Sequence, residues 1–304
     1  MTAPPPLRIG TRGSPLALAQ SEMVRGRLGL VDDSEIAVIK TSGDLLLDRP
    51  LSEAGGKGLF TKEIDEALLA GRVDLAVHSL KDVPTWLPEG IVLAAVLERE
   101  DPRDAFISLK AKNLIELPAG ATVGSASLRR QAQILHRRPD LKVTLLRGNV
   151  ETRLRKLHEG AVDATLLALA GLKRLGRADA ATAILGTDEM LPAPAQGAIA
   201  LACRAIDARV RERLAGLEHA PSRAEVTAER ALLEVLDGSC RTPIAALARA
   251  AGGRLTIEGL VAKPDGSRVI FGAREGVCAD AARIGRDLGQ FLRAEAGPGF
   301  LPGF

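Results

Sequence analysis

The sequence predicts an α/β protein with two similar α/β domains, each built on a mainly parallel sheet, and a small α+β C-terminal domain. Three observations support this fold class. Short apolar runs alternate with amphipathic helical stretches, three sequence patterns recur in the same order, and the pattern changes character near Pro221. A length of 304 residues is enough for two or three domains.

Strands and helices alternate in the first part of the chain. The four apolar runs that predict strands lie at residues 7–10, 36–41, 73–79 and 91–97. Residues 14–29 and 59–71 have apolar side chains at helical spacing and end at a glycine, so each predicts an amphipathic helix. This alternation favours a mainly parallel sheet.

The same succession of patterns returns later in the chain. The three matching pairs are IGTRGSPLALAQ (9–20) with VGSASLRRQAQ (123–133), VIKTSGD (38–44) with VTLLRGN (143–149), and GRVDLAVHS (71–79) with GAVDATLLA (160–168). Three matches in one order predict two similarly built domains. The crossovers between them are expected at residues 99–104 and 191–197, where prolines resist helix continuation. The apolar run at 198–203 is expected to return to the first domain's sheet.

The C-terminal part follows a different order. A strong helical pattern at residues 222–236 leads to a turn, and a second one closes the chain at 278–295. The short strands predicted between them lie at 244–250, 254–262 and 267–275. The expected domains are residues 1–98 with 198–216, residues 102–192, and residues 220–304.

Composition excludes several classes of protein. Aromatic residues make up only 2% of the chain and tyrosine is absent, which counts against stacking platforms for single-stranded nucleic acid. Three cysteines without a CxxC pattern and four scattered histidines indicate neither a disulfide framework nor a metal site. A net charge of +3 does not by itself imply a nucleic-acid partner. The start of the sequence lacks an apolar signal core, so a soluble, cytoplasmic protein is expected.

Two arginines follow the predicted strand that ends at Gly124. Ser125 or Ser127 is expected to cap the next helix, which places Arg129 and Arg130 in its first turn. Cations at a helix N-terminus oppose the helix dipole, whereas a bound anion there reverses the sign of the interaction. The pair is therefore either a solvated basic face or half of an anion site whose partner is a ligand rather than a core contact.

Further cations repeat this arrangement. Arg147 is expected at a strand end, with Arg153 on the helix that follows, and Arg155 is placed to pair with Glu151 on the surface. The other candidates are Arg12, Ser14, Lys57, Lys173 and Arg174. Ligands of open α/β sheets bind beyond the carboxyl ends of the strands, where most of these residues are expected. Together they predict a cleft for several carboxylates or phosphates.

Asp82 and Cys240 are the two residues with reactive side chains in unusual places. Asp82 follows a buried strand, and Pro84 is expected to hold Val83 extended. Its carboxylate either neutralises a neighbouring cation or stabilises a developing cation and moves protons. Cys240 lies in the turn LDGSCRTPI (236–244) and is either a chance loop cysteine or a reactive one, since a thiol beside an arginine ionises more readily than in a core.

These stretches resemble the hydroxymethylbilane synthase (porphobilinogen deaminase) family. The resemblance runs from about Leu7 to Ala246 and thins beyond Ala250. It is carried by RIGTRGSPLALAQ, GGKGLFTKEIDEALLAGRVDLAVHSLKDVPT, REDPRDAF, VGSASLRRQAQ, LRGNVETRL, AGLKRLG, LPAPAQGAIA and ERALLEVLDGSCRTPIA, which occur in this order.

The resemblance implies a fold and a reaction. It implies two domains similar to type II periplasmic binding proteins and a third domain that carries Cys240 on a loop. It implies a dipyrromethane cofactor joined to Cys240 by a thioether. The enzyme would be a transferase that joins four porphobilinogen molecules head to tail, releasing ammonia, to give hydroxymethylbilane for tetrapyrrole (porphyrin) biosynthesis. The expected partner is porphobilinogen alone, without nucleic acid, membrane or metal, and a monomer is expected.

The resemblance also assigns roles to residues. Asp82 matches the family's catalytic aspartate, which would hold pyrrole N–H groups and offset a pyrrolenine cation. The cofactor-binding positions are Cys240, Lys81, Ser127, Arg129, Arg130, Arg147 and Arg153. The substrate-binding positions are Arg12, Ser14, Gln20, Lys57 and Arg174. Twelve carboxylates on a chain of six pyrroles would explain a dense group of arginines in a protein of only +3 charge.

Departures from the family pattern and two rival interpretations remain. Glu53 stands at a position that is basic in some members, Ala126 replaces a frequent serine, and Ser239 replaces a frequent glycine. One rival is a non-catalytic anion-binding protein of the same two-lobed build, which would not need Cys240. The other is a nucleic-acid binder that uses the helix at 129–138, and it predicts affinity that falls steeply with salt.

Overall fold

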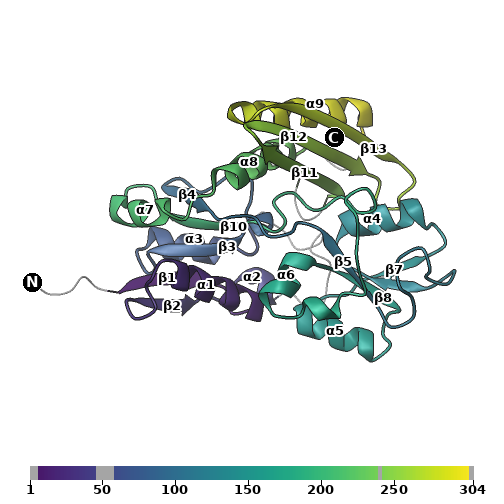
Figure 1. Cartoon of the computed structure of the whole chain (residues 1–304), viewed down its shortest axis with the longest axis horizontal. Helices are drawn as coiled ribbons and strands as arrows, with labels where there is room; N and C mark the ends of the chain where they lie inside the picture. Colours follow the sequence, from purple (N-terminus) through teal and green to yellow (C-terminus); the bar gives the residue numbers. More distant parts are fainter. Residues whose placement is uncertain (1–5, 46–57, 239–241, 301–304) are drawn as a thin grey trace, which may run out of the picture. The chain divides into compact units, whose positions relative to one another are not determined.

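The computed structural model describes residues 6–45, 58–238 and 242–300 (Figure 1). These residues form three separate sheets, and the chain divides into two compact units. The boundaries between the units fall at Arg99/Glu100, Gly197/Ala198 and Arg223/Ala224. The first unit holds one sheet, and the second holds the other two.

The sheet of the first unit has five strands. In spatial order they are β2 (Ser34–Val38), β1 (Leu7–Thr11), β3 (Leu75–Ser79), β10 (Ile199–Arg204) and β4 (Ile91–Val96). Strand β1 pairs in parallel with β2 and β3, whereas β10 is antiparallel to both of its neighbours. The return of residues 198–203 to this sheet is thereby confirmed.

Helices bury both faces of this sheet. The helices of the unit are α1 (Pro15–Arg27), α2 (Ser42–Leu45), α3 (Lys62–Leu69) and α7 (Ala208–Ala215). Val24 of α1 and Leu214 of α7 pack with Ile9 on one face, while Ile64 of α3 packs with Ala76 on the other. Because both faces are covered, the sequences of these strands are nearly continuous apolar runs, as is typical of parallel strands.

The second unit contains a sheet with the same strand order. Its strands are β7 (Lys142–Thr144), β6 (Thr122–Gly124), β8 (Ala164–Ala168), β5 (Asp104–Ser108) and β9 (Ala183–Ile184). Strand β6 is parallel to β7 and β8, and β5 is antiparallel to β8 and β9. The accompanying helices are α4 (Leu128–Arg137), α5 (Val150–His158) and α6 (Leu169–Arg174).

An aspartate in each repeat performs the same structural task. The Arg8 backbone N–H donates to Asp74 Oδ2 at 2.9 Å, and the Thr122 N–H donates to Asp163 Oδ2 at 2.7 Å. Each aspartate precedes the strand that pairs with the donor's own strand. The repeat inferred from short sequence matches is therefore confirmed by strand order and by equivalent hydrogen bonds.

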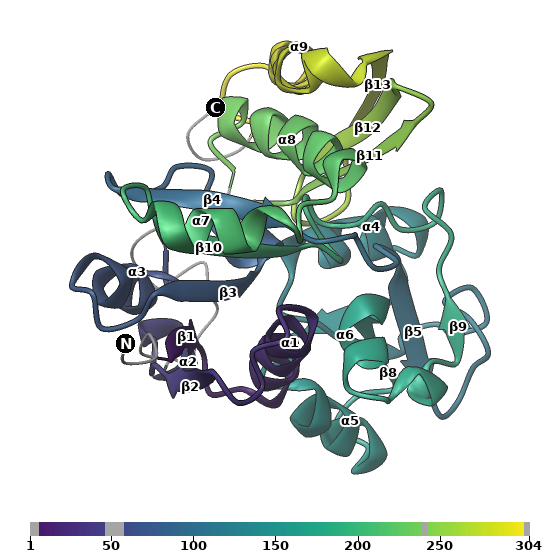
Figure 2. The same ribbon diagram turned by 60° about the vertical axis from the view of Figure 1, so that its left-hand side comes forward.

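The C-terminal part of the second unit is a three-stranded antiparallel sheet with two helices. Its elements are α8 (Ala220–Val235), which enters this unit at Ala224, β11 (Ile244–Ala251), β12 (Arg254–Ala262), β13 (Val269–Val277) and α9 (Ala281–Ala296). Helix α9 runs along this sheet in Figure 1, and Figure 2 shows it beside β13 in the turned view. A Cβ at Gly285 would lie 2.0 Å from the Ala228 carbonyl oxygen, so glycine is what lets α9 approach α8 so closely.

The predicted α/β class with an added α+β domain is confirmed, and a few element limits are corrected. Strand β2 ends at Val38 rather than at residue 41, and α3 begins at Lys62. Strand β7 ends at Thr144, so Arg147 lies beyond the strand and not at its end. Among the described residues, no helix is long and apolar enough to cross a membrane.

Candidate functional site

A small polar pocket opens in the first unit beside the carboxyl ends of β1 and β3. It has a volume of about 50 Å³. Its lining residues are Arg12, Ser14, Leu16, Ala17, Gln20, Phe60, Val77, His78, Ser79 and Asp82. The structure thus brings Asp82 together with Arg12, Ser14 and Gln20, which are predicted substrate-binding residues. The strand-end rule explains why residues up to 70 positions apart meet here.

Local sequence sets each side chain of this pocket. Strand β1 ends at Thr11, and Ser14 then caps α1, with its Oγ accepting the Ala17 N–H at 3.3 Å and Pro15 at the first helical position. Gln20 on α1 is buried, and its Nε2 donates to Ser79 Oγ at the end of β3 over 2.9 Å. This hydrogen bond ties the helix to the strand that leads to Asp82.

Asp82 sits at the end of a short 3₁₀ turn. Residues Leu80–Asp82 form that turn directly after β3, and the Leu80 N–H donates to the Ala198 carbonyl at 3.0 Å. Val83 is extended, with φ −86° and ψ 125°, as the following proline predicts. The backbone on both sides of Asp82 is therefore held, which fixes where its carboxylate can point.

Arg12 lies between two carboxylates. Its Nε donates to Asp44 Oδ1 at 3.1 Å, and its Nη1 lies 3.8 Å from Asp82 Oδ2. The guanidinium also stacks over the Phe60 ring at 4.2 Å from the centroid. A separation of 3.8 Å is too long for a hydrogen bond, so Arg12 stabilises the charge of Asp82 without donating to it.

Asp44 is a residue that the sequence analysis missed. Burial alone would raise the pKa of Asp44, but hydrogen bonds from Arg12 and Thr41 outweigh burial and hold the pKa below its ordinary value. The signal was present in VIKTSGD, one of the repeated stretches, where Asp44 ends the match. Its negative charge orients Arg12 and offsets the positive charge of that guanidinium.

His78 is a second residue that the sequence analysis assigned no role. Its imidazole is only 6% exposed, and it lines the same pocket as Arg12 and Asp82, the charged groups of that lining. Burial and, secondarily, the charge of Arg12 lower the pKa of His78 to about 4. His78 is therefore neutral at pH 7 and adds no charge to the pocket.

The lowered pKa of His78 predicts acid sensitivity. Because the unfolded chain binds this proton near pH 6.5 and the folded chain only near pH 4, stability is retained above about pH 6.5 and falls as the pH drops toward 4. The difference corresponds to at most about 3 kcal/mol. His78→Gln should flatten this limb of a plot of unfolding free energy against pH. A constant difference between the two proteins from pH 7 to pH 4 would contradict the assignment.

The second unit contains a buried cluster of Arg129, Arg130 and Asp104. Arg129 and Arg130 are 4% and 6% exposed, so the alternative of a solvated basic face is wrong. Their Nη2 atoms donate to the two Asp104 carboxylate oxygens at 2.9 and 2.8 Å. Burial would raise the pKa of Asp104, but the two arginine charges outweigh it and hold the pKa far below its ordinary value.

This cluster corrects the expectation that the partner of Arg129 and Arg130 is a ligand rather than a core contact. The anion beside Arg129 and Arg130 is supplied by the protein itself, so replacing either arginine removes a core contact as well as a positive charge. Loss of one partner of a buried pair is strongly destabilising.

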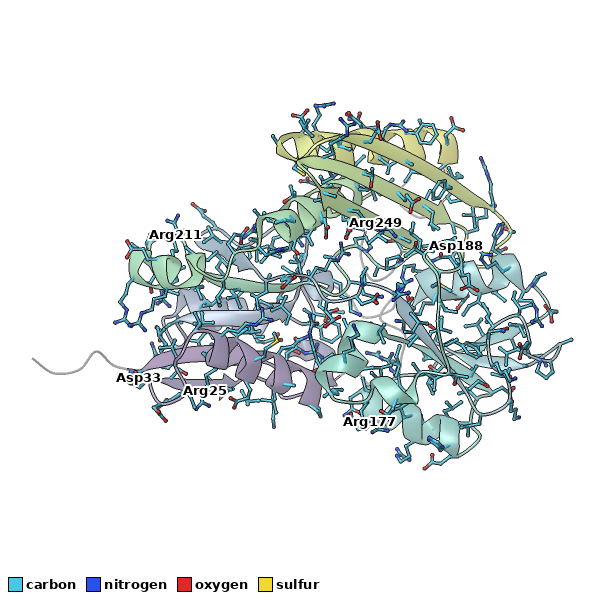
Figure 3. All side chains as sticks on the ribbon, viewed as in Figure 1. Arg25, Asp33, Arg177, Asp188, Arg211 and Arg249 are labelled. Carbon is cyan, nitrogen blue, oxygen red and sulfur yellow. The ribbon has the colours of Figure 1, made fainter. Side chains whose placement is uncertain are left out.

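By contrast, Arg211 on α7 and Arg249 on β11, both labelled in Figure 3, are exposed side chains.

The other predicted binding residues of the second unit are a serine that caps a helix and two arginines that donate to backbone carbonyls. Ser127 caps α4 and accepts the Arg130 N–H at 3.4 Å, which decides between the two serines. Arg153 Nε donates to the Gly148 carbonyl at 2.8 Å, and Arg174 Nη2 donates to the Gly197 carbonyl at 2.6 Å.

Some candidates have a different neighbour or fall outside the structure. Arg155 pairs with Glu159 at 2.7 Å and not with Glu151. Arg147 and Lys81 are both half-buried. Lys57 and Cys240 lie outside the described residues, as does Glu53.

Within the described part of the chain, no group of histidine, cysteine or acidic side chains is arranged to hold a metal ion.

The two described cysteines differ in environment. Cys203 is fully buried in β10, and burial raises the pKa of its thiol, which fits the expectation of a core residue. Cys278 is partly exposed, and its Sγ donates to the Arg254 carbonyl at 3.3 Å. For Cys203, burial outweighs the neighbouring charges of Arg204 and Arg211, so its thiol is not activated.

Comparisons with known proteins agree over nearly the whole chain. Residues 7–212 match the family described as "Porphobilinogen deaminase, dipyromethane cofactor binding domain", and residues 223–294 match "Porphobilinogen deaminase, C-terminal domain". A chloroplastic porphobilinogen deaminase from Oryza sativa subsp. japonica is 58% identical over 97% of this chain and 85% of its own length. A porphobilinogen deaminase from Nitrobacter winogradskyi is 57% identical over 96% of this chain and 94% of its own length.

A solved structure shows a more distant similarity. A periplasmic substrate-binding protein of an ABC transporter from Coxiella burnetii is 18% identical, with a TM-score of 0.43, over 73% of this chain and 94% of that chain.

Proposed function

The chain belongs to the porphobilinogen deaminase family, and on that premise we propose that Asp82 is its catalytic carboxylate and Cys240 its cofactor attachment site. The activity is that of a transferase of tetrapyrrole biosynthesis, which joins four porphobilinogen molecules head to tail with release of ammonia. The product is hydroxymethylbilane, and the primer is a dipyrromethane cofactor. The observation that carries the proposal is the pocket in which Asp82 meets Arg12, Ser14 and Gln20.

The residues of the second unit fit a cofactor that carries carboxylates. Two arginines and one aspartate give the buried group of Arg129, Arg130 and Asp104 a charge of +1. Among the described residues, the Arg129 Nε–H is buried and lacks a hydrogen-bond partner. Buried donors without partners are rare, and a bound ion is one explanation for such a donor. The residues that would hold the cofactor are Cys240, Lys81, Ser127, Arg129, Arg130, Arg147 and Arg153.

Asp82 acts on the charge that develops on the substrate. When bound, the dipyrromethane supplies the unsubstituted pyrrole carbon to which the incoming unit is joined. Loss of ammonia from porphobilinogen leaves a methylene-pyrrolenine cation, and a fixed carboxylate in a partly buried pocket stabilises it more than the neutral substrate. The side chain of Asp82 is 27% exposed, so it is shielded from water while still accessible to a ring N–H.

Arg12 binds a carboxylate of the substrate, and Gln20 positions the turn that carries Asp82. The Arg12 guanidinium is held by Asp44 and Phe60, which leaves it preorganised to receive an acetate or propionate of the substrate. Gln20 holds Ser79, three residues before Asp82, and so limits movement of the turn. Neutral His78 completes the wall without competing with Arg12 for the substrate's carboxylates.

The finer features of the proposal follow the family. We propose the domain limits given above, residues 1–98 with 198–216, 102–192 and 220–304, with Cys240 in the third domain. We also propose substrate-binding roles for Lys57 and Arg174, a monomer that binds porphobilinogen but neither nucleic acid nor membranes, and a cytoplasmic location. A chloroplastic location belongs to the names of the plant relatives.

The test is to incubate the purified protein with porphobilinogen. We expect one ammonia for each porphobilinogen consumed, together with an intact mass above that of the polypeptide. A protein that only binds anions would consume no substrate and would have the mass of its polypeptide. That result would contradict the proposed function.

A further inference from the structure

Asp104 accepts a full set of hydrogen bonds in the core of the second unit. It is completely buried at the start of β5. Its Oδ1 accepts from Arg130 Nη2 at 2.8 Å and from Gln196 Nε2 at 2.7 Å. Its Oδ2 accepts from Arg129 Nη2 at 2.9 Å and from Arg130 Nε at 3.2 Å. Four donors saturate the four lone pairs of the carboxylate.

The remaining arms of both arginines are also held by the backbone. Arg130 Nη1 donates to the Leu166 carbonyl at 2.8 Å, and Arg129 Nη1 donates to the Leu191 carbonyl at 2.7 Å. Each guanidinium is therefore attached at two sides, once to Asp104 and once to a carbonyl. An arginine held in this way loses little further entropy when it binds an anion.

Gln196 completes the network from another part of the chain. It is 1% exposed and lies between β9 and β10, next to Gly197 at the boundary of the unit. Its Nε2 donates both to Asp104 and to the Pro102 carbonyl, each at 2.7 Å. Gln196 therefore holds Asp104 and the segment before β5 in one geometry without adding a charge.

The charges of the network do not cancel. Two arginines and one aspartate leave a net positive charge, and both arginines lie in the first turn of α4, where the helix dipole disfavours cations. A buried positive excess is costly unless an anion balances it. Asp104 balances only one of the two arginine charges, so a ligand carboxylate would balance the second.

We propose that Asp104 and Gln196 are positioning residues, which hold the guanidinium groups of Arg129 and Arg130 so that a carboxylate of the growing cofactor binds while it is assembled. The inference rests on the proposed function and adds two residues to it. Asp104 supplies the negative charge that sets the geometry of both arginines. Gln196 supplies the fourth hydrogen bond and connects that geometry to the segment at Pro102.

The experiment measures cofactor assembly rather than turnover. Asp104→Asn, Gln196→Met and wild type are purified, and intact mass gives the fraction of chains that carry the covalent addition. Chains without it are then incubated with porphobilinogen, and the rate of mass gain is measured per folded protein, well below the unfolding midpoint. Asp163→Asn is the matched control, since Asp163 accepts the Thr122 N–H and pairs with Lys110 in the same unit, away from this network.

Assembly is expected to slow about tenfold or more in Asp104→Asn, as on loss of a group that orients a ligand-binding residue. In Gln196→Met it is expected to slow about fivefold, the effect of losing hydrogen bonds without a charge. Asp163→Asn should unfold at a lower temperature but assemble at the normal rate. A merely structural role of the network would lower the unfolding midpoint in the same way and leave assembly per folded protein unchanged.

Each outcome of this experiment either supports or contradicts the positioning role of Asp104 and Gln196. Slow assembly in Asp104→Asn and Gln196→Met with normal assembly in Asp163→Asn supports the proposal, and normal assembly in Gln196→Met overturns the joint role. If Asp104→Asn does not fold, the test rests on Gln196→Met alone. Slow cofactor assembly in Gln196→Met then supports the proposal, and normal assembly contradicts it. A wild type that never gains mass would overturn the proposed function itself, and is distinguishable because all four proteins would then behave alike.

Discussion

Cys240→Ser is expected to abolish both the covalent addition to the chain and nearly all turnover. On the proposed assignment, the Cys240 thiolate would form the thioether to the cofactor, whereas a serine hydroxyl is a far weaker nucleophile near neutral pH. The measurement is intact mass together with porphobilinogen consumption. The mass should equal that of the polypeptide, and consumption should fall to background.

The other two cysteines provide matched controls. Cys278→Ser changes a partly exposed side chain and should leave mass and activity unchanged. Cys203→Ser places a hydroxyl in a fully buried position of β10, so it should lower stability by about 1–3 kcal/mol while the folded protein still carries the cofactor. Full activity of Cys240→Ser, or loss of the covalent addition in Cys278→Ser, would contradict the assignment of Cys240.

Asp82→Asn is expected to lower kcat about a hundredfold or more, with KM changed much less. The asparagine keeps the size and hydrogen-bonding capacity of the side chain but removes the negative charge. If that charge stabilises the cation of the substrate, its loss affects the transition state more than the bound ground state. Because cofactor assembly uses the same chemistry, rates must be divided by the amount of loaded enzyme.

Two comparisons separate the catalytic role of Asp82 from a structural one. If Asp82 served only as a counterion, thermal stability would fall and kcat per loaded enzyme would hold. Asp44→Asn removes the other carboxylate beside Arg12, which does not line the pocket, and is expected to raise KM more than it lowers kcat. A near-normal kcat in Asp82→Asn would remove Asp82 from the mechanism.

Part of the site could be predicted because its residues follow local rules. Ser14 and Ser127 cap helices as their positions before helical stretches indicate, and Val83 is extended because a proline follows it. Asp82 and Arg12 meet because both follow strands of one sheet, whose carboxyl ends share an edge. The strand order of the second unit likewise follows from a repeat that is readable in short matches.

Other parts depended on pairings that no local pattern contains. Arg129 and Arg130 look the same in the sequence whether they face water, a ligand or an internal acid. Their partner Asp104 lies 25 and 26 positions away, and Gln196 lies 92 positions from Asp104. His78 was missed for the same reason, since a histidine carries no mark of burial in the sequence, and the repeat that ends at Asp44 does not show that Arg12 is its partner.

The sequence by itself determined the order of helices and strands, the internal repeat, the family, and the residues that gather at strand ends. The spacing of apolar residues, the glycines that end helices and the residues that cap them depend only on neighbours within a few positions. They can therefore be recognised in the sequence. Only the tertiary structure decided which charges are buried and which carboxylate each arginine meets. A buried ion pair forms where strands far apart in sequence bring opposite charges together out of water, and its energy depends on that three-dimensional environment.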